Sequence, residues 1–101
     1  MGVFPSATKI RIAILKKLKN GQTREKNEML KILAKHFGLS LPQFAMKNPD
    51  GRNKWDHRVR WELSWLRKRN LIKNTRLGHF HITSLGKDIL QLCESYKRQN
   101  D

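Results

Sequence analysis

Residues 53–70, NKWDHRVRWELSWLRKRN, combine side chains that bind phosphate with side chains that can read nucleotide bases. If this segment is a helix, with about 100° between successive residues, one arc is polar and carries Asn53, His57, Arg60, Ser64 and Arg67, with Lys68 beside it. The opposite arc is apolar and carries Trp55, Val59, Leu63 and Leu66, with Glu62 between them. Polar groups of these types bind phosphate oxygens and base edges in DNA. The segment therefore predicts an amphipathic helix with one face on a protein core and the other on DNA.

His57 and Arg60 are the first candidates for base contacts. They lie in the N-terminal half of the helix, the part that reaches base edges in helix-turn-helix proteins. Arginine can also bind guanine through two hydrogen bonds. For Asn53, Lys54 and Ser64 a phosphate contact is favoured over a base contact. An ordinary solvated basic face has the same composition, so that alternative stays open.

The basic residues at the end of this helix have two interpretations. Arg67, Lys68 and Arg69 would interact favourably with the helix macrodipole and would equally suit phosphate contacts. Arg58 falls toward the packed side, and Glu62 follows four residues later. We therefore expect an Arg58–Glu62 ion pair and a structural role for Arg58.

The three tryptophans of this segment are large enough to anchor a small core. We expect Trp55 and Trp65, the latter at the edge of the apolar arc, to be such anchors. Trp61 lies on the boundary between the two arcs. Packing is favoured for it, and the alternatives are contact with a base methyl group or a place in a pocket for a modified base.

No catalytic or metal-binding constellation stands out. The histidines His36, His57, His79 and His81 lack zinc-finger spacing, and Cys93 is expected to be a small core residue. The eight acidic residues are scattered, whereas a Mg²⁺ nuclease needs clustered carboxylates. We expect no metal, no cofactor and no catalysis by this chain alone.

Composition supports a polyanionic partner. The chain has 101 residues, of which 38% are hydrophobic, and carries a net charge of +14 from 22 Lys+Arg against 8 Asp+Glu. Its size predicts one domain over 1–101 with one modest core, and its charge favours nucleic acid. The apolar runs are too short to span a membrane and the start lacks signal-peptide order. With one cysteine, these features predict a soluble, cytoplasmic protein.

Helices are predicted at 6–20, 26–37, 53–70 and 84–98, and a β-hairpin at 71–83. Asn20-Gly21 and Gly38 end the first two helices, and Asn70 is expected to be left-handed after the third. Gln22 to Arg24 would fit a brief strand. The last helix has an apolar face at three- and four-residue spacing, made of Leu85, Ile89, Leu92, Cys93 and Tyr96.

The segment 39–52 is irregular, with Pro42 and the turn Asn48-Pro49-Asp50-Gly51. Its apolar residues could pack a short extra turn against the core; they are Leu39, Leu41, Phe44 and Met46. This connection is longer than the three or four residues of a minimal helix-turn-helix, which indicates a variant.

Three helices, a two-stranded hairpin and a closing helix predict a mainly α (α+β) fold, a winged helix-turn-helix. Arg76 and His79 flank the tip of the hairpin, or wing. There Arg76 would contact the minor groove or phosphate, and the alternative is a solvated hairpin.

Several motifs in this region also resemble the N-terminal domain of Mrr-type restriction endonucleases. They are Arg58-Val59-Arg60-Trp61, Trp65-Leu66, Leu71-Ile72, Gly78, Phe80, Ile82-Thr83 and Gly86. The resemblance covers roughly residues 8 to 92 and is specific from Trp55 to Leu90. This chain departs from the family in having Asn70 where Gly is usual, and in the longer connection before the third helix.

The resemblance implies a double-stranded DNA-targeting module of a restriction system, which would normally precede a nuclease domain and often acts on methylated DNA. Three other functions stay open: a free-standing transcriptional regulator, an RNA-binding domain and a protein-interaction domain. The sequence predicts no exposed aromatic pair on a sheet of the kind that stacks single-stranded bases. The charge excess argues against a purely apolar protein-interaction surface.

Overall fold

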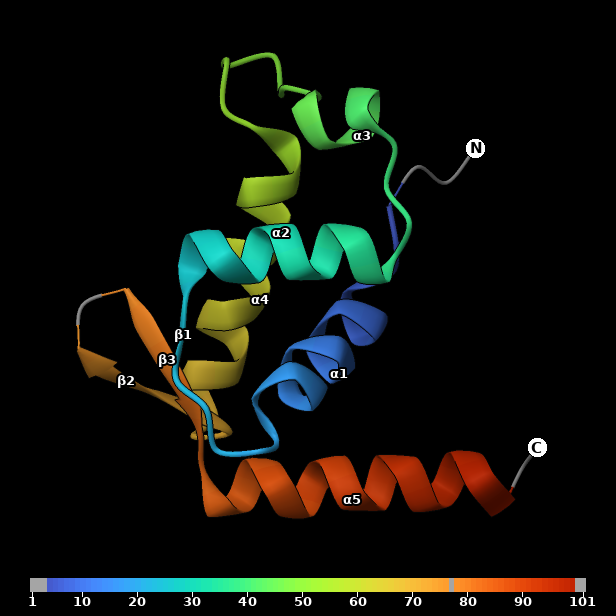
Figure 1. Ribbon diagram of the computed structural model, residues 1–101, viewed down its shortest axis with the longest axis vertical. Helices are drawn as coiled ribbons and strands as arrows, with labels where there is room; N and C mark the ends of the chain where they lie inside the picture. Colours follow the sequence, from blue (N-terminus) through green and yellow to red (C-terminus); the bar gives the residue numbers. More distant parts are fainter. Residues whose placement is uncertain (1–3, 77, 100–101) are drawn as a thin grey trace.

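The computed structural model describes residues 4–76 and 78–99, with side chains up to Tyr96 (Figure 1). In chain order the elements are α1 (Ala7–Leu18), β1 (Arg24–Glu25), α2 (Lys26–His36), α3 (Leu41–Ala45), α4 (Lys54–Lys68), β2 (Ile72–Arg76), β3 (His79–Ile82) and α5 (Ser84–Gln99). The arrangement is mainly helical with a small antiparallel sheet, a winged-helix-like α+β fold. The two short elements β1 and α3 lie where the sequence allowed a brief strand and a short extra turn.

The helix ends follow local side-chain chemistry. The Ser6 hydroxyl accepts a hydrogen bond from the Lys9 amide and begins α1. Ser40 and Gln43 form a capping box that begins α3. After α4, Asn70 adopts a φ of 61°, the left-handed conformation expected at this position. This turn redirects the chain from α4 into the hairpin.

The core lies between α1, α2 and α4. The largest fully buried side chains include Ile10, Ile14, Leu18, Met29, Leu33, Trp55, Val59 and Leu66. Trp55 is a core anchor, as predicted, and its indole Nε1 donates a hydrogen bond to the Leu30 carbonyl oxygen at 3.1 Å. The apolar arc of α4 is therefore committed to the protein interior.

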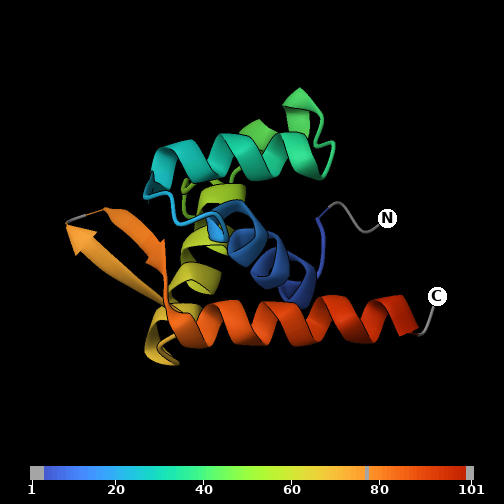
Figure 2. The ribbon, with the colours of Figure 1, turned by 60° about the horizontal axis from the view of Figure 1, so that its bottom comes forward.

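The sheet has the strand order β1-β3-β2, with both pairs antiparallel. Arg24 pairs with Phe80, and Ile72 pairs with Ile82. Along β3, Phe80 and Ile82 are buried and the alternate residues are half-buried, so one face of the hairpin rests on the core. Figure 2 shows the hairpin projecting beside α4.

Thr83 and Gly86 join the hairpin to α5. The Thr83 hydroxyl donates a hydrogen bond to the Asn70 carbonyl oxygen at 2.6 Å and accepts one from the Gly86 amide at 3.0 Å. A Cβ at Gly86 would overlap with the Leu71 carbonyl oxygen. Only glycine therefore allows α5 to begin this close to the end of α4.

The connection between α2 and α4 differs in part from the prediction. Leu39 and Phe44 are partly buried against the core, but Leu41 is 84% exposed. The expected packing of Leu41 is wrong because α3 is a single short turn whose first residue points outward. The turn before α4 forms as expected, with the Gly51 amide donating to the Asn48 carbonyl oxygen at 2.9 Å.

The last helix is the main departure from the predicted core. Leu90 is buried and Ile89 is partly buried, but Leu85, Leu92 and Tyr96 are exposed. Cys93 is only partly buried. The C-terminal half of α5 extends beyond α1 in Figures 1 and 2, so α1 covers only part of the predicted apolar face.

Candidate nucleic-acid interface

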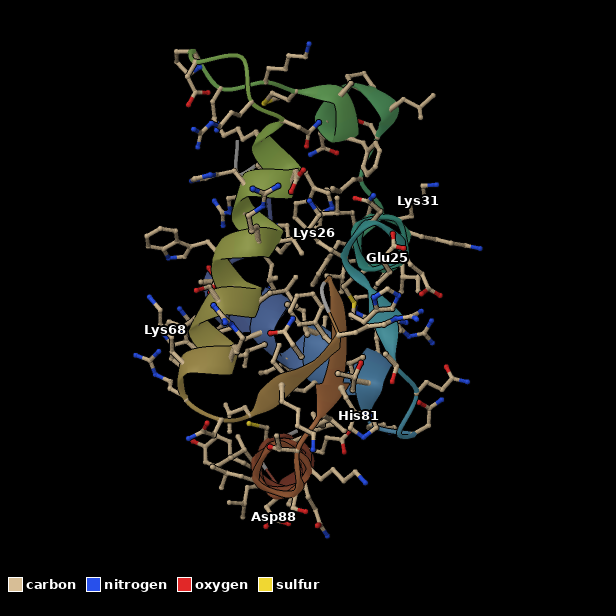
Figure 3. The ribbon with its side chains drawn as sticks, turned by 90° about the vertical axis from the view of Figure 1, so that its left-hand side faces the viewer. Glu25, Lys26, Lys31, Lys68, His81 and Asp88 are labelled. Carbon is tan, nitrogen blue, oxygen red and sulfur yellow. The ribbon has the colours of Figure 1, made fainter. Side chains whose placement is uncertain are left out.

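The outer surface of α4 is polar except for one tryptophan. We call it the α4 ridge and define it by His57, Trp61, Ser64 and Lys68. His57, Trp61 and Lys68 are exposed and Ser64 is half-buried. Figure 3 shows this surface in profile, with Lys68 at the outer edge of α4 and pointing away from the rest of the protein. The polar arc of this helix therefore faces outward, as the sequence predicted.

A groove of about 500 Å³ separates α4 from the hairpin. We call it the α4–hairpin groove; its lining residues are Lys26, Arg60, Leu63, Ser64, Arg67, Asn74, Thr75, Arg76 and Phe80. Its four cations come from α2, α4 and β2. Figure 3 shows Lys26 between α2 and α4. Cations that converge from three elements on one groove suit a chain of phosphates.

Asp56 holds two of these cations. Its Oδ1 atom lies 3.5 Å from Lys26 Nζ and 3.5 Å from Arg60 Nη2. This oxygen is buried and accepts no hydrogen bond from the described residues, so the two cations are its compensation. The Arg60 side chain is nevertheless 64% exposed. Asp56 thus restrains Arg60 through one nitrogen and leaves the other guanidinium N–H groups available to bind a ligand.

Sequence reasoning missed Lys26, Asn74 and Thr75 as members of the groove. The i,i+4 spacing of Asp56 and Arg60 could have predicted their ion pair from the sequence. For Lys26 there was none, because its position depends on how α2 crosses α4.

Asn53 is engaged within the protein at both ends of its side chain. Its Oδ1 accepts a hydrogen bond from the Asp56 amide at 2.8 Å, and its Nδ2 donates to the Phe44 carbonyl oxygen at 2.9 Å. It is the N-cap of α4. The structure therefore gives Asn53 a capping role, and its phosphate contact stays a prediction. Lys54 Nζ lies over the Phe4 ring, 5.8 Å from its centroid, outside the α4–hairpin groove.

Arg11 of α1 fixes α4 to the rest of the protein. Its Nε donates to Glu62 Oε1 at 2.7 Å, and Glu62 is only 5% exposed. The predicted Arg58–Glu62 pair is wrong, because Glu62 turns toward α1 and Arg58 donates instead to the Pro5 carbonyl oxygen at 2.8 Å. Arg58 keeps the structural role that we expected.

Trp65 lies between two guanidinium groups. The Arg11 Cζ is 3.7 Å from the ring centroid and the Arg69 Cζ is 3.8 Å from it. The ring is half-buried against the core, so the predicted anchor lies at the core's edge. The stack holds the end of α4 against α1.

Trp61 is 64% exposed, so the favoured prediction of packing is wrong for this residue. Its ring centroid lies 6.2 Å from that of His57. A shallow cavity of about 280 Å³ runs beside it and is lined by Trp61, Ser64, Trp65, Lys68 and Arg69. The α4 ridge therefore presents an aromatic surface next to cations.

At the hairpin, Arg76 is exposed and its Nη2 lies 3.3 Å from His79 Nε2. The two residues pair across β2 and β3, next to an irregularity in the register after Asn74. Arg76 faces the groove, whereas His79 is half-buried beside it.

The family model described as the Mrr N-terminal domain matches residues 8–92. The chain belongs to the Mrr N-terminal domain family. Comparison with curated proteins and with solved structures gave no match. Several residues that carry the family resemblance have structural roles in this Mrr N-terminal domain. Phe80 and Ile82 face the core. Gly78 adopts a φ of 74° in the hairpin turn, and Gly86 lies against Leu71.

The described residues of this Mrr N-terminal domain bear on metal binding and on membrane crossing. They include no group of three or more His, Cys, Asp or Glu side chains placed to hold a metal ion. None of their helices combines the length and the apolar character needed to cross a bilayer.

Proposed function

We propose that this Mrr N-terminal domain is the double-stranded DNA-binding module of a restriction system. The observation that carries the proposal is the α4–hairpin groove, where Lys26, Arg60, Arg67 and Arg76 converge beside the exposed α4 ridge. Three separate elements supply these cations, so the positive surface follows the shape of a helix and wing and is not confined to one solvated helix face.

In this mechanism, charge places the domain and α4 then reads the groove. The cations of the α4–hairpin groove neutralise phosphates and release counterions, which makes affinity fall steeply with salt. The N-terminal half of α4 enters the major groove, where His57 and Arg60 reach base edges. Arg76 on the hairpin contacts phosphate or the adjacent minor groove.

Modification of the DNA is a second element of the proposal. The exposed indole of Trp61 offers an apolar contact for a base methyl group, beside the polar groups of the α4 ridge. Such a contact would favour duplexes that carry 5-methylcytosine or N6-methyladenine. Binding is the proposed role of this chain itself, and cleavage is assigned to a nuclease domain or subunit.

The test is binding to duplexes of one sequence, unmodified or carrying either methylated base, at two salt concentrations. We expect duplex binding that weakens with salt, and a preference for one methylated duplex that persists at the higher salt. Equal affinity for all duplexes would remove modification reading from the proposal. Equal or tighter binding to RNA of the same sequence would overturn the DNA assignment.

Arg60→Ala tests the role of α4, and Arg52→Ala is its matched control. Both remove one exposed arginine that lies near an aspartate, but Arg52 lies in the loop outside the groove. If Arg60 binds a base through two hydrogen bonds, its loss should reduce discrimination by about 1–3 kcal/mol. A uniform loss on every sequence would make Arg60 a phosphate contact, and equal losses in both variants would contradict the proposed groove.

A further inference from the structure

An apolar stripe on α5 lies outside the proposed DNA interface. Leu85, Leu92 and Tyr96 are 48%, 66% and 69% exposed. They are seven and four residues apart, which places them along one side of the helix. An exposed row of large apolar side chains on a single helix is unfavourable in water and is typical of a surface that another element covers.

The stripe borders a groove of about 550 Å³ between α1, α2 and α5. Its apolar lining includes Ile12, Phe37, Leu92, Cys93 and Tyr96, and Lys9, Lys16, His36 and Glu94 also line it. In Figures 1 and 2 the C-terminal half of α5 points away from the β2–β3 hairpin. A partner on this groove would leave the hairpin and the adjacent face of α4 free.

Charged side chains without an ion-pair partner in the described part of the chain flank this surface, an acidic one on α5 and two basic ones on α1, while Glu94 in the groove pairs with Lys19. On the α5 side, Asp88 is three residues after Leu85 and four before Leu92, is exposed, and makes no ion pair with the described residues. Figure 3 shows Asp88 pointing away from the rest of the protein. On the α1 side, Lys9 and Lys16 line the groove and likewise make no ion pair within the described part.

The lysines of α1 also act on His36, which lines the same groove. Burial, and then the charges of Lys17 and Lys16, lower the pKa of His36 below 6.5. A carboxylate placed here would be attracted by Lys9 and Lys16.

We infer that two copies of this chain associate through α5, with the apolar stripe of each copy against the groove of the other. A two-fold interface uses the same surface of both copies, so it must be complementary to itself. This one is complementary: apolar residues meet apolar residues at the centre, and the unpaired Asp88 of one copy faces Lys9 and Lys16 of its partner. A partner with acidic residues alone would leave Asp88 facing a like charge.

The dimer does not depend on the proposed DNA binding, but it would allow the protein to bind DNA through two α4 ridges at once. Two copies joined through α5 would carry two α4 ridges. Dimeric helix-turn-helix proteins use such pairs to bind two half-sites related by symmetry.

The test is the mass of the protein in solution, measured by sedimentation equilibrium on the full chain without DNA, from about 1 to about 500 μM. Leu92→Gln removes the centre of the stripe, and Leu41→Gln is the matched control, because it makes the same change at an 84% exposed leucine on α3. Neither change removes a buried side chain, and circular dichroism checks that both variants are folded.

We expect wild type and Leu41→Gln to dimerise with the same dissociation constant, and Leu92→Gln to dimerise at least about tenfold more weakly. Wild-type protein that stays monomeric over the whole range would overturn the inference, as would a Leu92→Gln variant that dimerises as well as the control. Affinity for a short duplex with one binding site is measured in parallel and should be the same for both variants. Loss of dimerisation and loss of DNA binding are thereby distinguished.

Discussion

The contact between Arg11 and Glu62 makes a strong prediction about stability. Arg11→Met keeps most of the aliphatic stem but leaves the Glu62 carboxylate, 5% exposed, without its 2.7 Å partner. Breaking a fully buried ion pair by removing one partner costs about 3–5 kcal/mol. Arg11 is partly accessible to water, so we expect a loss at or below the lower end of that range, about 2–3 kcal/mol. For a domain of this size, that would lower Tm by roughly 10–20 °C.

The assay is urea unfolding followed by circular dichroism, with a double-mutant cycle of Arg11→Met and Glu62→Gln. Because the second change removes the uncompensated charge, the double variant should be more stable than the sum of the single effects by about 1–2 kcal/mol. Arg69→Met is the control for a stacking arginine without an ion pair; besides the stack it removes one hydrogen bond, from Arg69 Nη1 to the Trp65 carbonyl oxygen at 3.2 Å. Arg69 stacks on the other face of Trp65 at 3.8 Å and forms no ion pair with the described residues, so its loss should cost about 1 kcal/mol or less.

Two results would refute this reasoning. If Arg11→Met costs no more than Arg69→Met, the bond to Glu62 contributes little and stacking on Trp65 explains the role of Arg11. If the effects of Arg11→Met and Glu62→Gln simply add, the two side chains act independently and do not hold α4 against α1.

Three further outcomes are expected. Gly86→Ala places a methyl group against the Leu71 carbonyl oxygen and should destabilise the fold by about 1–3 kcal/mol; unchanged urea unfolding would show that α5 can shift freely. Trp61→Ala should leave Tm unchanged, since the ring is mostly exposed, but should weaken binding to duplex DNA in a fluorescence anisotropy titration; a large drop in Tm would place the ring in the core. The pKa of His36, measured by NMR, should lie below 6.5 because of burial and Lys17, and Lys17→Gln should raise it. The contribution of His36 to stability is therefore present above pH 6.5 and lost as pH falls through its folded-state pKa, and an NMR value of 6.5 or above would contradict this.

Local patterns of the sequence determined the helices and the side of α4 that is buried. The apolar spacing of Trp55, Val59, Leu63 and Leu66 predicted the face that lies in the core. The position of Asn70 after that helix predicted its left-handed conformation. These predictions held because periodicity and capping depend on neighbours within a few residues.

The tertiary structure alone decided which side chains meet. Glu62 had Arg58 within reach along its own helix, yet it pairs with Arg11, which lies 51 residues away in sequence. Lys26 enters the α4–hairpin groove only because α2 crosses α4 there. In the same way, periodicity marked α5 as amphipathic but could not predict that α1 covers only part of its apolar side. A repeat shows that a helix has an apolar face, whereas the packing of distant elements determines how much of that face is covered.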